Sequence, residues 1–205
     1  MEAACTNCGY KHSQDTVPLI NVADNPSLKG KVADGSLFVW ECPCCGRRNL
    51  LKYQTIYHDP SKRLMIWLLP EGEKAPGAVE EAVKQLDDYT LRVVQDPGAL
   101  IEKVKIAEAG LDDVAMEMCK YVTAMEMYGK NPDKEILDTT FRFMRLDGAD
   151  NDILLAFPLG GNMQVVNIGF NVYEDAFAIL SRNPAAAPGR GFANIDRNYI
   201  LNFFR

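Results

Sequence analysis

Four of the six cysteines in this chain have the spacing of metal ligands, and they are its clearest candidates for chemistry. They form two pairs, each with two intervening residues and a glycine directly after: Cys5 with Cys8, and Cys42 with Cys45. This spacing lets both sulfurs of a pair reach one metal ion from a tight turn, and the glycine accepts the positive φ that such a turn often needs. Tetrahedral sulfur ligation selects Zn²⁺. The cysteines therefore predict one zinc site per chain.

Other assignments of the ligands stay open. Cys44 permits a pairing with Cys42 through one intervening residue, but Cys45 restores the spacing of the first pair and precedes Gly46, so we assign Cys45. His12 follows the first pair and is an alternative ligand, although four sulfurs complete a set without it. Buried free thiols and an iron–sulfur cluster are further alternatives. A zinc ion held by four thiolates has no open position, so it would stabilise the fold and not catalyse.

The other candidates for catalysis are weak. Cys44 lies near Arg47, whose positive charge would favour a reactive thiolate, but an incidental small residue is the simpler interpretation. Cys119 lies on an apolar helix face and is expected in the core. His58 lies in an expected turn, and neither histidine belongs to a nucleophile–base motif. We therefore assign no catalytic residue, which favours a non-enzymatic protein while leaving an enzyme open.

Composition and charge indicate a globular protein without a basic surface. The chain has 205 residues, 47% of them apolar and 24% charged. It has no apolar stretch of about 18 residues and no secretory signal, so we expect no membrane span and a cytoplasmic location. The net charge is −6, of which residues 1–70 contribute +2 and the remainder −8. Four thiolates around zinc would bring the first segment near neutrality, so we expect weak nucleic-acid binding.

The elements that must position the cysteines indicate an α+β fold in two modules. A polar stretch rich in proline and glycine at 70–77 predicts a boundary between residues 1–70 and residues 78–205. We expect the first module to be zinc-ribbon-like, with two C-x-x-C knuckles and a β-hairpin, and the second to be mixed α+β with an antiparallel sheet. In the first module we predict strands at 17–22, 37–41, 50–57 and 64–69, and a helix from about Pro26 to Gly35. In the second module we predict helices at 78–88, at 97–109, from Asp112 or Asp113 onward, at 171–180 and at 194–204. We predict strands there at 91–94, 140–146, 153–157 and 163–170. The last two strands are joined by a tight hairpin at 160–162.

These motifs resemble the CpXC family, which is named for its cysteine-proline-x-cysteine motif. Cys42-Pro43-Cys44-Cys45 matches that motif, and Cys5-x-x-Cys8 matches its N-terminal pair. The strings at 57–60 and 110–113 are also similar, and the resemblance covers roughly residues 1–130. It implies a bacterial or archaeal cytoplasmic protein with a zinc-binding domain, and it implies no activity.

The sequence therefore favours a zinc-stabilised, non-catalytic binding protein whose partner is another protein. One alternative is an enzyme with its active site in the second module, where glycine-rich loops occur at 160–161 and 189–191. Another is a zinc ribbon associated with nucleic acid. Its local patch would combine the aromatic residues Tyr53 and Trp67 with the cations Arg47, Arg48, Lys52, Lys62 and Arg63.

Overall fold

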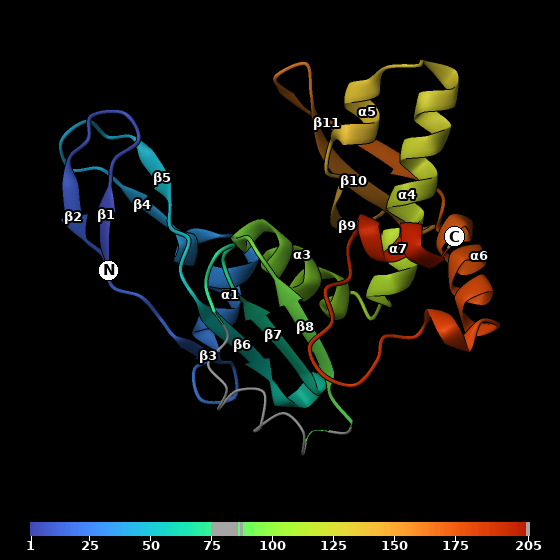
Figure 1. The fold of residues 1–205 in the computed structure, drawn as a ribbon, viewed down its shortest axis with the longest axis horizontal. Helices are drawn as coiled ribbons and strands as arrows, with labels where there is room; N and C mark the ends of the chain where they lie inside the picture. Colours follow the sequence, from blue (N-terminus) through green and yellow to red (C-terminus); the bar gives the residue numbers. More distant parts are fainter. Residues whose placement is uncertain (75–85, 87, 204–205) are drawn as a thin grey trace. The chain divides into compact units, whose positions relative to one another are not determined.

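The computed structural model describes residues 1–74, 86 and 88–203, and in them the chain is α+β (Figure 1). It forms two compact units. Unit 1 contains Met1–Ile101 with Arg190–Ala193, and unit 2 contains Glu102–Gly189 with Asn194–Arg205. Of the helix predicted at 78–88, all but residues 86 and 88 lie outside the described residues.

The division between the units lies at Ile101 and not at the predicted boundary of residues 70–77. The reason is a parallel strand pair: β8 (Thr90–Val94) lies beside β7 (Leu64–Leu68) over its whole length. The two strands that flank the proline- and glycine-rich stretch therefore belong to one sheet. Whether residues 1–70 and 78–205 fold separately stays a prediction.

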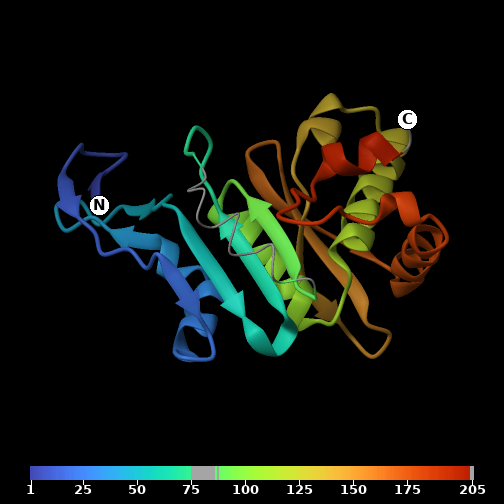
Figure 2. The same ribbon diagram turned by 60° about the horizontal axis from the view of Figure 1, so that its bottom comes forward.

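The main sheet of unit 1 has four strands in the order β3-β6-β7-β8, which Figure 2 shows side by side in blue to green. β3 (Leu19–Asn21) runs parallel to β6 (Thr55–Asp59), and β6 pairs antiparallel with β7. Alternate residues of β6 are buried, as the period of two in a strand requires. Ile20, Tyr57 and Ile66 are fully buried, so this sheet has its own apolar core.

Between the two cysteine pairs the chain forms helix α1 (Ser27–Ala33) and the 3₁₀ turn η1 (Ser36–Phe38). The helix stops before Gly35, whose φ of +77° is a left-handed conformation, and this confirms the predicted end. The same glycine starts η1. The strand predicted at 37–41 is therefore wrong in its first half, since β4 begins only at Val39.

The strand predicted at 50–57 is also interrupted in the structure. β5 (Arg48–Leu50) ends early and β6 begins at Thr55, with irregular chain between them. The turn η2 (Pro60–Lys62) then joins β6 to β7, close to the turn predicted there. Asp59 caps this turn, because its Oδ1 accepts hydrogen bonds from the backbone N–H groups of Ser61 and Lys62, at 3.1 and 3.3 Å.

Unit 2 contains the predicted antiparallel sheet, with the strand order β11-β10-β9. Its strands are β9 (Arg142–Asp147), β10 (Asp152–Leu159) and β11 (Asn162–Ile168). Gly160 and Gly161, with φ of +58° and +75°, join β10 to β11 in the two-residue turn that matches the twist of a hairpin. Every second side chain of β10 is buried, at Ile153, Leu155 and Phe157.

The helices of unit 2 gather around α4 (Asp113–Lys130), which begins where the sequence predicted. The Asp112 carboxylate caps it by accepting the N–H groups of Val114 and Ala115 at 2.9 and 2.8 Å. Helix α4 contacts the three helices that follow it in the chain. These are α5 (Lys134–Asp138), α6 (Phe170–Ser181) and α7 (Arg197–Phe203), and the 3₁₀ turn η3 (Pro184–Ala186) follows α6.

The start of α6 corrects one prediction. The helix begins at Phe170 with Gly169 as its N-cap, so the cap predicted at Asn171 is wrong. The Asn171 side chain occupies the space that a Cβ on residue 169 would need. Only glycine leaves that space open, and the N-cap lies two residues earlier than the capping pattern indicates.

Helices α3 (Pro97–Glu108) and α4 bury a group of charged side chains within unit 2. Each member is at most 9% exposed: Glu102, Lys103, Asp113, Glu117 and Lys120. The charges are paired. The Lys120 Nζ lies 2.9 Å from Glu102 Oε1 and also contacts Glu117, and the Lys103 Nζ lies 2.8 Å from Asp113 Oδ2. Pairing of this kind is what makes buried charge tolerable.

Strand β9 completes this group through Glu102. The Arg142 Nη1 lies 2.9 Å from Glu102 Oε2, and the Phe143 N–H donates to Glu102 Oε1 at 2.8 Å. Burial raises the pKa of Glu102, but Lys120 and Arg142 lower it more, so the carboxylate stays charged. This one side chain therefore ties α3 to both α4 and β9.

Candidate metal centre

Two short hairpins carry the paired cysteines. The first joins β1 (Glu2–Ala4) to β2 (Lys11–Ser13), and Cys5 follows β1 directly. The Cys5 N–H donates to the Tyr10 carbonyl oxygen at 2.8 Å, and the Gly9 N–H donates back to the Cys5 carbonyl oxygen at 3.0 Å. Gly9 has a φ of +72°, as the spacing predicted.

The second hairpin repeats this geometry. It joins β4 (Val39–Glu41) to β5, and Cys42 follows β4 directly. The Cys42 N–H donates to the Arg47 carbonyl oxygen at 2.9 Å, and the Gly46 N–H donates to the Cys42 carbonyl oxygen at 2.8 Å. Gly46 has a φ of +69°. The two knuckles therefore present their cysteines in the same way.

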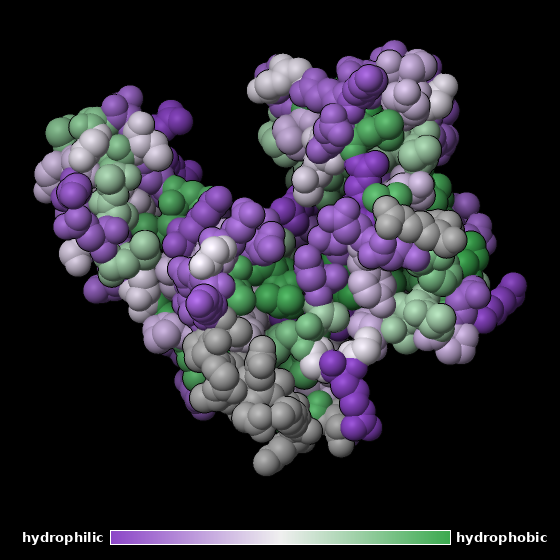
Figure 3. Space-filling model, in the orientation of Figure 1, coloured by the Kyte–Doolittle hydropathy of each residue, from purple (hydrophilic) through white to green (hydrophobic). Residues whose placement is uncertain are grey.

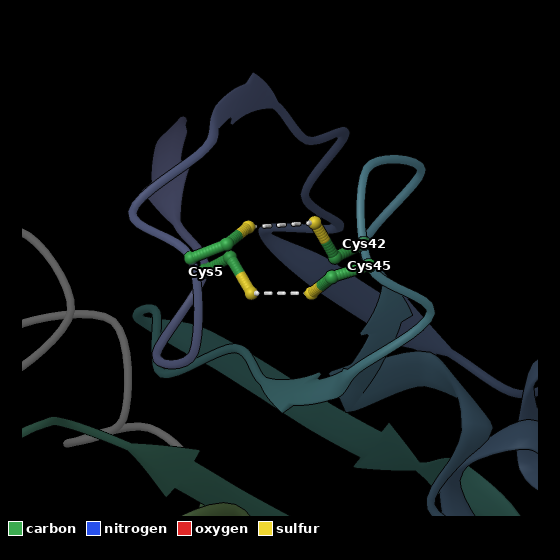
Figure 4. A group of neighbouring side chains, drawn as sticks. Cys5, Cys42 and Cys45 are labelled. Carbon is green, nitrogen blue, oxygen red and sulfur yellow. Dashed lines mark hydrogen bonds between the residues drawn. The ribbon is translucent and has the colours of Figure 1, made fainter.

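The four predicted ligands come together in space. The sulfur atoms of Cys5, Cys8, Cys42 and Cys45 all lie within 4.8 Å of one another. Each knuckle faces the other, with Cys5 Sγ 3.6 Å from Cys45 Sγ and Cys8 Sγ 3.6 Å from Cys42 Sγ (Figure 4). A tetrahedral site with metal–sulfur bonds of about 2.3 Å has edges of about 3.8 Å, so the cluster has the size of such a site. These residues fit one metal ion.

Contacts within the cluster shift the pKa values of Cys5 and Cys8 in opposite directions. Burial raises the pKa of Cys5, but the N–H groups of Cys8 and Asn7 and the neighbouring thiols lower it more, to about 6. For Cys8 the Tyr10 N–H lowers the pKa, but burial and the other thiols raise it more, to about 12. Four negative sulfurs this close repel one another, and a cation among them removes that repulsion.

Asn49 supports the cluster from the second hairpin, and sequence reasoning missed it. Its side chain is buried and crosses to the first knuckle, where Oδ1 accepts the backbone N–H and the hydroxyl of Thr6, both at 2.9 Å. Its Nδ2 donates to the Arg47 carbonyl oxygen at 2.7 Å and lies 3.6 Å from Cys5 Sγ. Outer contacts of this kind orient metal ligands. Only the pairing of the hairpins reveals this role, because Thr6 and Asn49 are far apart in sequence.

The alternative ligands lie elsewhere in the described structure. Cys44 is exposed and does not join the sulfur cluster. His12 contacts Gln14 through Nδ1, at 2.9 Å, and its ring stacks on Trp40 with a centroid distance of 6.3 Å. Neither residue is needed to complete four ligands.

Cys119 and His58 lie in surroundings that suit a structural role. Cys119 is fully buried in α4, and burial raises its pKa to about 12, which is the environment of an unreactive core thiol. His58 lies within β6 and not in the turn after it, with Nε2 3.2 Å from the Tyr89 hydroxyl. The predictions of a core position for Cys119 and a structural role for His58 fit this geometry.

The fold and this site define an α+β protein whose N-terminal, zinc-ribbon-like module carries four cysteines able to hold a metal ion. The family profile described as CpXC protein matches residues 3–120, and the chain belongs to the CpXC family. The matched segment contains all four cysteines and extends into α4. No curated protein and no solved structure matches the chain. Among the described helices, none has the length and apolar character that a bilayer crossing requires.

Proposed function

We propose that the protein is a zinc-stabilised, non-catalytic binding protein whose partner is another protein. The observation that carries the proposal is the cluster of four sulfurs within 4.8 Å of one another, contributed by two knuckles of equal geometry. Four thiolates suit Zn²⁺ and fill its tetrahedral coordination, so no position is left for a substrate or an activated water. Cys5 and Cys42 are buried, which further shields the ion.

The proposed location is the reducing cytoplasm, and the proposed source is bacterial or archaeal. All six cysteines are free thiols, and free thiols persist in compartments where disulfides do not form. The source rests on the family resemblance alone.

Metal analysis tests the central claim. Protein purified without chelator should contain about one zinc ion per chain, because one tetrahedral site takes four thiolates. Replacing any of Cys5, Cys8, Cys42 or Cys45 with serine should lower the bound zinc well below that ratio. Cys44→Ser is the matched control, since it changes the same knuckle without touching the cluster.

Substitution with Co²⁺ separates the alternatives. A four-thiolate site gives intense sulfur-to-cobalt absorption and tetrahedral ligand-field bands, and these should persist in Cys44→Ser and His12→Ala. A brown protein with bound iron and sulfide would point to an iron–sulfur cluster. If Cys44→Ser loses the metal while Cys45→Ser keeps it, our assignment of the ligands is wrong.

One observation favours a second candidate, a ribbon associated with nucleic acid. Tyr10 is 42% exposed and lies beside His12, with ring centroids 6.2 Å apart, and Arg47 and Arg48 are exposed on the other hairpin. Exposed aromatic rings can stack on bases, and exposed arginines can contact phosphates. On the side of the hairpins that Figure 3 shows, hydrophobic and hydrophilic residues are interspersed.

A binding titration decides between the candidates. Because the chain carries a net charge of −6, we expect single- and double-stranded nucleic acids to bind no more tightly than about 10⁻⁴ M at physiological salt. Micromolar affinity that disappears in the Arg47→Glu, Arg48→Glu double variant would favour the nucleic-acid candidate over a protein partner.

A further inference from the structure

The antiparallel sheet of unit 2 ends in an open edge at β11. In the described part of the chain this strand pairs only with β10, and its seven residues are mostly exposed. A strand at a sheet edge presents unpaired N–H and C=O groups that can pair with another chain.

The hairpin geometry shows which backbone groups are free. Leu159 and Asn162 flank the two-residue turn, so they form the hydrogen-bonded pair that closes the hairpin. In an antiparallel pair such positions alternate with positions whose N–H and C=O groups point away from the partner strand. The outward groups of β11 therefore belong to Met163, Val165 and Asn167.

This edge lacks the usual protection against pairing. The sequence of β11 is Asn-Met-Gln-Val-Val-Asn-Ile, which contains no charged residue and no proline. The opposite edge, β9, carries Arg142, Arg145 and Asp147 and has a register shift against Leu154 and Leu155. Charges and bulges are what native sheets use to block edge pairing. One edge of the sheet is thus protected and the other is not.

The side chains along the open edge add an apolar surface. Met163 is 66% exposed and Val165 is 56% exposed, on the sheet face that also carries Pro158 and Ala156 of β10. The other described edge strands of the molecule are shorter than β11, and β3 has only three residues. Among the edge strands that the structure describes, β11 is therefore the longest, and it carries exposed apolar side chains.

We propose that β11 pairs antiparallel with β11 of a second copy of this chain, about a two-fold axis at Val165. Val165 would then face itself, and Met163 would face Asn167 of the other copy. The outward groups of these three residues would form about six hydrogen bonds and join two sheets into one. A second copy fits because the strand is uncharged: two-fold pairing brings identical strands together, and like charges facing each other would oppose it.

The mass of the full-length protein in solution tests this pairing. Multi-angle light scattering and sedimentation velocity should give twice the chain mass of 22.8 kDa, with dissociation on dilution. Val165→Lys places two positive charges opposite each other, and Val165→Pro removes a donor whose N–H points away from β10. Each change should weaken dimerisation by about tenfold or more.

Two controls separate pairing from folding. Val165→Thr keeps a β-branched, uncharged residue, and Gln164→Lys adds the same charge where the residue faces Val166 of the other copy, so both should remain dimeric. Circular dichroism and thermal unfolding should show that all four variants stay folded. In the wild-type dimer, hydrogen exchange at the amides of Met163, Val165 and Asn167 should slow as concentration rises.

Three results would overturn the proposal. A monomer at all concentrations, with rapid exchange at these amides, would show that the edge stays open or awaits a different protein. A dimer that survives both Val165→Lys and Val165→Pro would place the interface elsewhere. Equal weakening by Gln164→Lys and Val165→Lys would exclude a two-fold axis at Val165.

Discussion

Gly9 and Gly46 hold left-handed backbone conformations at equivalent points of the two knuckles. A Cβ would meet nothing within 4 Å at Gly9, and only the Glu41 carboxylate at 3.9 Å at Gly46. Space is therefore available at both positions, and the cost of a side chain there comes from the backbone alone. That cost is about 1–2 kcal/mol for most residues and less for asparagine.

We predict that Gly9→Ala and Gly46→Ala weaken metal binding by roughly tenfold, because the strain falls on the turn that holds the cysteines. Gly9→Asn should weaken it less. Gly30→Ala is the control, since Gly30 lies in α1 with open space around it and has no left-handed φ. Competition with a chromophoric chelator measures each affinity. Equal affinities for all four variants would show that the turn geometry does not limit binding.

Asn49 provides the second prediction at this scale. Asn49→Ala removes the side chain that joins the second hairpin to Thr6 and Cys5 of the first knuckle. Metal affinity should therefore fall by roughly 10–100-fold, while saturating zinc still gives one ion per chain. Asn49→Asp should be worse, since it loses the donor and adds negative charge beside the thiolates. Arg48→Ala, an exposed neighbour on the same strand, should leave the affinity unchanged.

The clustering of four cysteines could be predicted from the sequence, but the contacts that support the cluster could not. Two pairs with equal spacing and a following glycine pointed to Cys5, Cys8, Cys42 and Cys45, and their sulfurs do cluster. Local spacing contains that information because each knuckle closes on itself. The contact of Asn49 with Thr6 depends on how one hairpin lies on the other, and no local pattern encodes it.

Among the elements, α4 offers a comparison between a buried and an exposed lysine. Lys120 is paired with Glu102 and Glu117 inside unit 2, whereas Lys130 pairs with Glu126 in solvent at 2.6 Å. Removing one partner of a buried pair leaves charge without compensation. We predict that Lys120→Met lowers the free energy of unfolding by about 3–5 kcal/mol, whereas Lys130→Met changes it by less than about 0.5 kcal/mol.

Urea unfolding at neutral pH measures both values. Glu102→Gln should also be destabilising, since its carboxylate accepts the Phe143 N–H and faces Arg142. If Lys120→Met and Lys130→Met prove equally mild, the buried group does not hold α3, α4 and β9 together.

The cap of η2 gives a pH-dependent prediction. Burial raises the pKa of Asp59, but Ser61 and Lys29 lower it more, so the folded pKa lies below the ordinary value. The stabilising effect is therefore complete above the unfolded pKa of about 3.9 and is lost as pH falls through the lower folded value. Asp59→Asn should destabilise at pH 7, and its difference from wild type should shrink below about pH 4. A difference that stays constant from pH 7 to pH 3 would contradict this.

Elements with their own start and stop signals were predicted, and those set by neighbours were not. Asp112 caps α4, and Gly160–Gly161 closes the hairpin, because these interactions lie within a few residues. The start of α6 has no side-chain cap, and no local signal marks the break in the strand predicted at 50–57. The short helix α5 has too few residues to leave a periodic pattern.

For the whole molecule, the residues that form the two sheet cores are different from those that form the cysteine cluster. The β3-β6-β7-β8 sheet buries Ile20, Tyr57 and Ile66, and the β9–β11 sheet buries Ile153 and Leu155. We predict that a strong chelator speeds hydrogen exchange in β1, β2, β4 and β5 while amides of β6, β7 and β10 stay protected. Simultaneous loss of protection in all of these strands would mean that the metal stabilises the entire fold.

The positions of the two knuckles along the chain have a topological consequence. Cys8 and Cys42 enclose 33 residues, which include β3 and α1, so a shared ion would turn this interval into a closed ring. Closing a ring of that size removes freedom from the unfolded chain, worth roughly 3–4 kcal/mol for a permanent cross-link. Because the link would be a metal ion, the ring opens and closes with metal supply. A protease cut after Lys31 would leave two fragments that the ion and the β3–β6 strand pair both hold together, so withdrawing the ion would remove one of these two links.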